Sequence, residues 1–99
     1  AQDDDIASGV IQAVRQARRQ DDLFIVGGGG MKDMVKRVMD GDQLTPVDVL
    51  YPPAMIETAM ELTVLKFTSQ IPVSGEYILG SPLINQENAA DYYFPDSPF

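Results

Sequence analysis

Apolar residues recur at helical spacing in three stretches of the chain. They lie three or four positions apart in 5–19, in 31–39 and again in 52–68, where a double proline suits a helix start. Between these stretches, 23–26 and 46–51 are short and rich in branched apolar residues, as is typical of buried strands. The pattern therefore predicts three helices that alternate with strands.

The last third of the chain is less regular. A loop at 71–75 precedes two short extended pieces, 76–79 and 82–84, and one or two helical turns at 87–92 lead into an aromatic, acidic tail at 93–99. In the third helix, the spacing predicts that the following side chains are buried: Met55, Ile56, Ala59, Met60, Leu62, Thr63 and Phe67. The same spacing predicts core packing for Met31, Met34, Met39, Met55 and Met60.

This order of elements predicts the fold class. Alternating helices and strands form a parallel sheet with right-handed crossovers and helices on both faces, a three-layer α/β sandwich. With 99 residues and no internal repeat, 1–99 is expected to be a single domain. Ala1–Gln2 resembles a strand end with no initiator Met or signal sequence before it, so we expect a partial domain from a longer chain.

The composition excludes several kinds of chemistry. The sequence has no Cys and no His, which rules out disulfides, thiolate catalysis, Ser-His triads and metal sites built on these residues. Its formal net charge of −8 repels phosphate backbones, so no nucleic-acid partner is expected. Nothing in the sequence predicts a cofactor.

Three segments lie where the predicted strands end: Asp3–Asp5, Gly27–Gly30 and Leu50–Pro52. In open α/β sheets, ligands bind beyond the carboxyl ends of the strands. We therefore expect these segments to share one edge of the sheet and to form one candidate binding cleft.

Asp3 is the acidic candidate for a ligand contact, because it lies nearest the strand end. Its carboxylate can accept hydrogen bonds from sugar hydroxyls. For Asp4 and Asp5, we favour capping of the first helix and interaction with its dipole. A magnesium site of the receiver-domain kind is not expected, since no separate phospho-acceptor Asp or later Lys is placed correctly, and no metal site is predicted.

Gly28 and Gly29 belong to a run of four glycines that matches neither phosphate-binding motif of nucleotide sites. Such a run serves a steep turn with positive φ, which we favour, or the close approach of a ligand to bare backbone. Tyr51 either stacks on a sugar face or packs on the prolines that follow it. Gly28, Gly29 and Tyr51 therefore join Asp3 as candidate ligand-binding residues.

Catalysis has little support in the sequence. A paired-carboxylate hydrolase needs two carboxyl groups about 5–10 Å apart across a cleft. Apart from Asp3–Asp5, only Asp48 is near the proposed edge, and it lies in mid-strand. The chain is not expected to be an enzyme.

Four stretches of the sequence resemble type I periplasmic sugar-binding proteins. AQDDDIASGVIQAVRQA at 1–17 is similar to a segment that usually reads A-x-N-D-x-x-A-x-G-x-x-x-A-x-x-x-A, and LFIVGGGG at 23–30 to a strand that usually ends V-G-F-D-G. RVMDGDQLTPVDVLYPPAMIETAMEL at 37–62 resembles the segment that follows. PLINQENAADYYFPDSPF at 82–99 resembles the tail of sugar-uptake members, with its E-N…Y-Y-F-P-D-S ending.

The resemblance implies the C-terminal part of the second lobe of a two-lobe periplasmic receptor. Such a receptor captures a sugar or polyol and delivers it to the membrane permease of an ABC importer. The polar ligand contacts of the family fall on Asp3 in place of Asn, on Gly29 in place of Asp, and on Leu50 or Tyr51 in place of Gln. Gly29 lacks the carboxylate of the family's Asp, and neither Leu50 nor Tyr51 has the amide of its Gln. The resemblance therefore implies a preferred ligand other than simple ribose.

Two alternatives stay open. The effector-binding domain of a sugar-responsive transcription regulator shares this fold, although regulators seldom carry such a tail. A self-associating α/β interaction module would pair through an open sheet edge, because unpaired strand edges invite association. We expect a homo-oligomer through the truncated sheet edge.

Overall fold

The computed structural model describes residues 1–69 and 72–98. Its elements are α1 (Asp4–Gln16), α2 (Lys32–Met39), β1 (Asp48–Val49), α3 (Met55–Thr68), β2 (Leu83–Ile84) and α4 (Ala89–Tyr92). Ile71 of the expected loop, Gln70 just before it and Phe99 of the tail lie outside the described residues. All the predicted helices are present, with bounds shifted by a few residues.

The ends of α1 follow from local chemistry. Asp3 is the N-cap, and its side chain accepts a hydrogen bond from the backbone N–H of Ile6. The helix ends earlier than the apolar spacing predicts, because Arg18 has a left-handed backbone with φ 56°. The amide of Arg19 then bonds back to the carbonyl of Val14, which closes the last turn.

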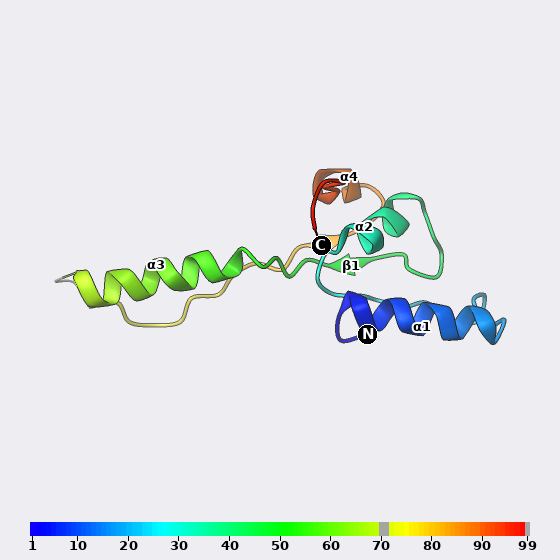
Figure 1. The fold of residues 1–99 in the computed structure, drawn as a ribbon, viewed down its shortest axis with the longest axis horizontal. Coiled ribbons are helices and arrows are strands. Elements are labelled where there is room, and N and C mark those ends of the chain that lie inside the picture. Colours follow the sequence, from blue (N-terminus) through cyan, green and yellow to red (C-terminus); the bar gives the residue numbers. More distant parts are fainter. Residues whose placement is uncertain (70–71, 99) are drawn as a thin grey trace.

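Strand pairing is sparse and mixed in direction. Two isolated bridges, Val26–Val47 and Gly29–Leu50, join the expected strand 23–26 and the turn after it to the expected strand 46–51. Both bridges are parallel, as expected. The prediction of a parallel last strand is wrong, because β1 and β2 pair antiparallel, with Asp48 opposite Ile84. The chain leaves β1 toward α3 and returns alongside its outgoing path, so it re-enters the sheet in the opposite direction (Figure 1).

The helices lie on both sides of these extended segments. In Figure 1, α1 lies on one side of β1, and α2 and α4 lie on the other. Ala7 and Ile11 of α1 form one buried cluster with Ile25, Met34 and Leu44. A second cluster joins α2, β2 and α4 through Val35, Val38, Ile84 and Ala89. Since α2 contributes to both clusters, it is the central packing element of the compact part.

Helix α3 projects away from this compact part (Figure 1). The described chain measures 60 × 23 × 22 Å, and its radius of gyration of 17.2 Å exceeds the ~13 Å of a compact domain this size. No residue of α3 is buried, so the prediction that its apolar side chains are buried is wrong. The spacing identified the helix, but no described element covers it. Among the described residues, no helix has both the length and the apolar character needed to cross a membrane.

Candidate ligand-binding site

The three segments predicted to share an edge lie together in the structure. We call this edge, formed by Asp3, Gly27–Gly30 and Leu50–Pro52, the rim. One hollow of about 480 Å³ is lined by Asp3, Gly27, Gly28 and Tyr51, together with Ala1, Gln2 and Val49. Tyr51 also lines a second hollow of about 300 Å³, which is bounded by Gly29, Gly30, the double proline and the aromatic tail. The chain order alone located this edge correctly.

Asp3 lies at the rim and also caps α1. Its Oδ1 accepts the Ile6 N–H at 2.8 Å, and the residue is exposed. The expectation that Asp4 and Asp5 provide the cap is wrong, because they occupy the first turn and Asp3 is the N-cap. A carboxylate offers about four lone-pair sites, so capping leaves Asp3 able to accept further hydrogen bonds.

Asp4 is buried beneath the glycine turn and holds it in place. It is 1% exposed, and its Oδ1 accepts the Gly28 N–H while its Oδ2 accepts the Met31 N–H, both at 2.8 Å. These bonds satisfy amides that no regular strand or helix pairs. The carboxylate therefore connects the start of α1 to the turn that precedes α2.

Asp48 of β1 supports the same turn from the other side. It is fully buried, its Oδ2 accepts the Gly30 N–H at 3.1 Å and its Oδ1 accepts the Val49 N–H at 2.9 Å. Burial, and then the negative charge of Asp4, raise the pKa of the Asp48 carboxyl to about 6. The two carboxyls are neighbours, because an oxygen of each lies close to the position that a Cβ on Gly27 would occupy.

The glycine turn has the backbone that the sequence predicts. Gly29 and Gly30 have positive φ values of 150° and 84°. Gly27 is required for a different reason: a Cβ placed there would overlap Asp4 Oδ1 and would lie 2.8 Å from Asp48 Oδ1. The glycines thus serve the turn and the two carboxyls, and their contact with a ligand stays a prediction.

Tyr51 is the exposed aromatic group of the rim. It is 66% exposed and lines both hollows, with Pro52 and Pro53 beside it in the second. Packing on the prolines and stacking on a ligand are therefore both sterically open to this ring. Phe94, 63% exposed, lines the second hollow as well, so the tail adds an aromatic group that the sequence did not place.

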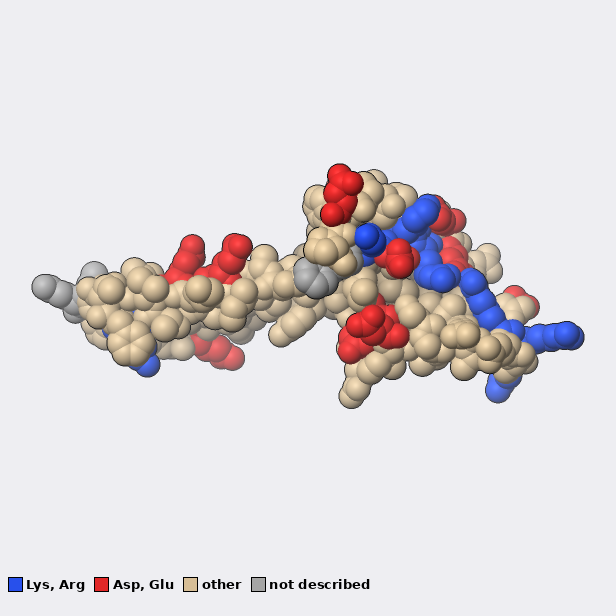
Figure 2. Space-filling view, in the orientation of Figure 1, with Lys and Arg blue, Asp and Glu red and all other residues tan. Residues whose placement is uncertain are grey.

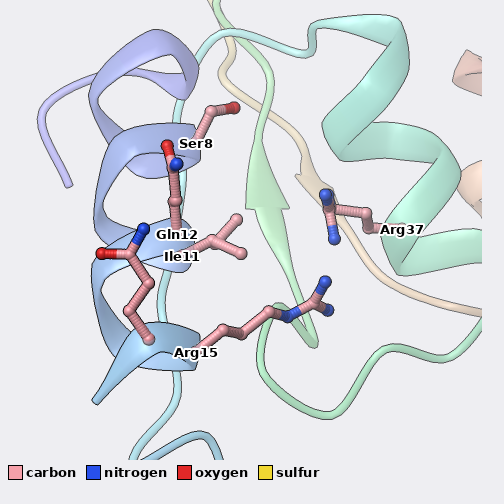
Figure 3. Close-up of a pocket in the computed structure, with 6 residues that line it drawn as sticks. Ser8, Ile11, Gln12, Arg15 and Arg37 are labelled. Carbon is pink, nitrogen blue, oxygen red and sulfur yellow. The ribbon is translucent and has the colours of Figure 1, made fainter. Parts of the chain in front are cut away.

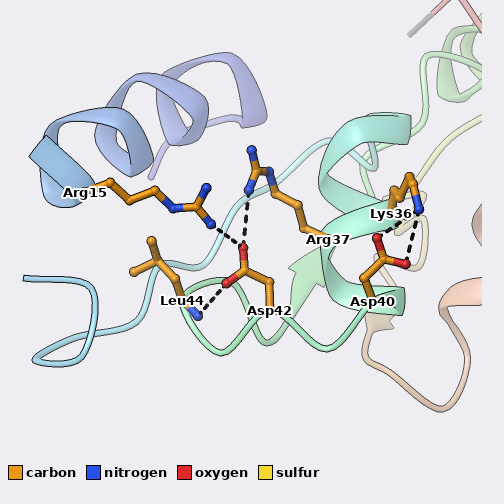
Figure 4. Close-up of polar contacts among 6 residues, drawn as sticks. All are labelled: Arg15, Lys36, Arg37, Asp40, Asp42 and Leu44. Carbon is orange, nitrogen blue, oxygen red and sulfur yellow. Dashed lines mark hydrogen bonds and ion pairs between the residues drawn. The ribbon is translucent and has the colours of Figure 1, made fainter.

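A separate hollow lies between α1 and α2, away from the rim. It measures about 420 Å³, and Arg15 and Arg37 point toward each other across it (Figure 3). Both guanidinium groups bind Asp42 Oδ2, at 3.0 and 3.2 Å, and Asp42 Oδ1 accepts the Leu44 N–H (Figure 4). Because Asp42 binds both guanidinium groups, the hollow is a structural junction between α1 and the loop after α2.

Two site residues escaped the sequence interpretation, Asp4 and Asp48. Asp4 resembled a capping residue, and Asp48 was placed in mid-strand without a role. A charged residue within a buried strand was the available signal, since such residues are rarely buried without partners. Among the described residues, no group of three or more acidic side chains could hold a metal ion.

The fold defined by these elements is α/β, and comparison with solved structures agrees. The chain is similar to a crystal structure of a galactofuranose binding protein, with a TM-score of 0.76 and 23% sequence identity over 94% of this chain. The chain spans 31% of that protein's length. No protein-family model matches the sequence, and no curated protein does.

Proposed function

We propose that the chain is part of a periplasmic solute-binding protein that captures a sugar or polyol for uptake by an ABC importer. One observation carries this proposal: Asp3, bare glycine backbone and an exposed tyrosine converge on one hollow at the edge where α/β folds bind ligands. A carboxylate, bare glycine backbone that a ligand can approach closely and an aromatic face are features that suit a polyhydroxylated ring. The fold shared with a galactofuranose binding protein supports the same ligand class.

The proposal includes a second lobe supplied by chain outside these residues. The solved neighbour is about three times as long as this chain, which leaves room for one. Helix α3 supports this view, because it exposes several large apolar side chains and such a surface is normally covered. In the intact receptor, the lobes close around the ligand by a hinge motion, and the closed form engages the membrane permease.

Calorimetry on the full-length receptor with a sugar panel tests this function. The panel includes furanose and pyranose sugars, and we expect one of them to bind. Tyr51→Ala should weaken binding by about tenfold, because it removes the stacking face at the rim. Tyr77→Ala is the matched control, since Tyr77 is also exposed and lies in none of the rim hollows. Equal losses in the two variants, or no binding of any sugar, would contradict the proposal.

A further inference from the structure

Two carboxyls beneath the rim have no role in the proposed ligand contacts. Asp4 is 1% exposed and Asp48 is fully buried, although they come from different elements. Between them they accept the amides of Gly28, Gly30, Met31 and Val49. In the described part of the chain, no Lys or Arg forms an ion pair with either carboxyl.

Two buried like charges that face the same glycine cannot both be held inside a protein without penalty. Two adjacent carboxyls out of water favour a state in which they share one proton, because each negative charge opposes the ionisation of the other. Burial and the negative charge of Asp4 both favour protonation of Asp48. Gly27 brings them together by leaving the space where a Cβ would lie.

The charged groups on the neighbouring segments are engaged elsewhere. The Ala1 amine donates to the Val26 carbonyl at 2.7 Å, and Lys32 Nζ donates to the Ser97 carbonyl at 2.7 Å. Asp3 accepts from the Ile6 amide, and Asp5 and Asp33 are exposed. From β2, the residue opposite Asp48 is the apolar Ile84. Asp4 is therefore the charge that acts on Asp48.

We propose that Asp4 and Asp48 share one proton and form a pH-dependent switch that holds the glycine turn at 27–30 in its rim geometry. When the shared proton is lost, the carboxyls repel each other, Asp48 gains water and the amides of the turn lose their fixed acceptors. The turn is therefore ordered in mildly acidic solution and loosened above neutral pH. As far as it concerns ligand affinity, this inference rests on the proposed function.

The sequence makes this switch unusually easy to observe. The chain contains no His, so no side chain with an ordinary pKa titrates between the Asp/Glu range and neutrality. The raised pKa of Asp48, about 6, falls within this window.

A pH titration of the 99-residue chain by amide NMR tests the inference. We expect the Gly28, Gly30, Met31 and Val49 resonances to shift with a common midpoint between about pH 5 and pH 7. Hydrogen exchange at the turn amides, corrected for its intrinsic pH dependence, should be about tenfold more protected at about pH 5 than at about pH 7.5. Flat resonances, or a midpoint below about pH 4.5 like that of an ordinary carboxyl, would overturn the inference.

Variants assign the midpoint to the pair. Asp48→Asn should abolish it, and Asp5→Asn, which neutralises an exposed acid of the same helix turn, should leave it unchanged. A midpoint that survives in Asp48→Asn overturns the inference. If Asp48→Asn does not fold, Asp4→Asn is the second test: it removes the repulsion but not the burial, so the midpoint should move to lower pH, and an unchanged midpoint would overturn the inference.

A binding experiment separates this inference from the proposed function. In the full-length receptor, the Kd for the identified sugar should rise severalfold from about pH 5.5 to about pH 7.5, and this dependence should vanish in Asp48→Asn. If the turn titrates but no sugar binds, the pH switch stands and the proposed receptor function fails. If a sugar binds but the turn does not titrate, the receptor function stands and the pH switch fails.

Discussion

At the scale of single residues, the geometry of the rim depends on carboxyls that lie beneath it. Asp4 and Asp48 accept the amides of Gly28, Gly30 and Met31, which no strand or helix bond pairs. Gly27 provides the space that both of them occupy. The sequence predicted the positive φ of the turn from its glycines, but it did not predict this support. Which acceptor meets a turn amide depends on contacts between segments far apart in sequence.

Gly27→Ala should destabilise the fold. The added methyl group would overlap Asp4 Oδ1 and would lie 2.9 Å from Met34 Cε, so buried groups have to move. Overpacking of this kind costs about 1–3 kcal/mol in the free energy of unfolding, measured by urea denaturation. Gly9→Ala is the control: a Cβ at this helical position meets nothing within 4 Å, and a gain of about 1 kcal/mol is expected. A Gly27→Ala variant as stable as the wild type would show that the turn is not tightly packed.

Asp48 makes stability depend on pH in a defined direction. Its pKa is raised from 3.8 to about 6 on folding, so the native state binds more protons than the unfolded state between these values. Stability from this group is therefore greatest at the acidic end of the window and falls as pH rises through about 6. Between about pH 5 and about pH 7.5, the free energy of unfolding should fall by about 1.4 kcal/mol.

Urea denaturation at several pH values measures this effect. In Asp48→Asn the fall should disappear, because the amide does not ionise. A stability that rises over the same range in the wild-type chain would contradict the assignment of a raised pKa to Asp48.

At the scale of elements, helices could be predicted far better than strand direction. Apolar spacing located α1, α2 and α3, with acidic residues at the start of α1 and a double proline before α3, since these signals are local. The direction of β2 depends on the path of the chain between Leu50 and Pro82, which leaves for α3 and returns alongside, with the Leu50 N–H bonded to the Pro82 carbonyl. No local pattern encodes that return, so the parallel prediction failed for β2 and succeeded for the bridges at Val47 and Leu50.

The capping role of Asp3 at α1 can be tested by its effect on stability. Asp3→Ala should lower the free energy of unfolding by about 1 kcal/mol, because the Ile6 amide loses its acceptor. Asp3→Asn should keep almost all of that stability, since Asn caps as well as Asp does. Thermal and urea unfolding measure both variants. If Asp3→Asn loses as much stability as Asp3→Ala, the carboxylate charge rather than the cap bond would be the stabilising feature.

At the scale of the whole molecule, the main feature is apolar surface that the described part of the chain leaves uncovered. Phe67 is 81% exposed and Ile56 is 61% exposed, and a shallow apolar hollow runs along α3 between Ile56 and Val64. Figure 2 shows that the projecting part is mostly uncharged on this face, whereas basic side chains gather over the compact part. The sequence predicted an apolar helix correctly and its burial wrongly, because periodicity reports which face is apolar and not what lies against it.

This surface should make the isolated chain self-associate. Large exposed apolar patches on soluble chains mark interaction surfaces or aggregation-prone sites, and α3 offers one along its length. The average mass from light scattering should therefore increase over a concentration series. The double variant Met60→Lys/Val64→Lys should shift the chain toward monomer, because both residues line the apolar hollow of α3. Glu61→Lys changes the net charge by the same amount without removing apolar surface, so its association should match that of the wild type.

The same experiment distinguishes α3 from the open strand edge that the sequence suggested for association. Pairing of backbone edges needs no side chain of α3, so it would survive Met60→Lys/Val64→Lys unchanged. Association lost equally in Glu61→Lys would indicate a purely electrostatic effect. A wild-type chain that stays monomeric at every concentration would show that exposed α3 is tolerated in solution, and would remove the argument that a further lobe is needed to cover it.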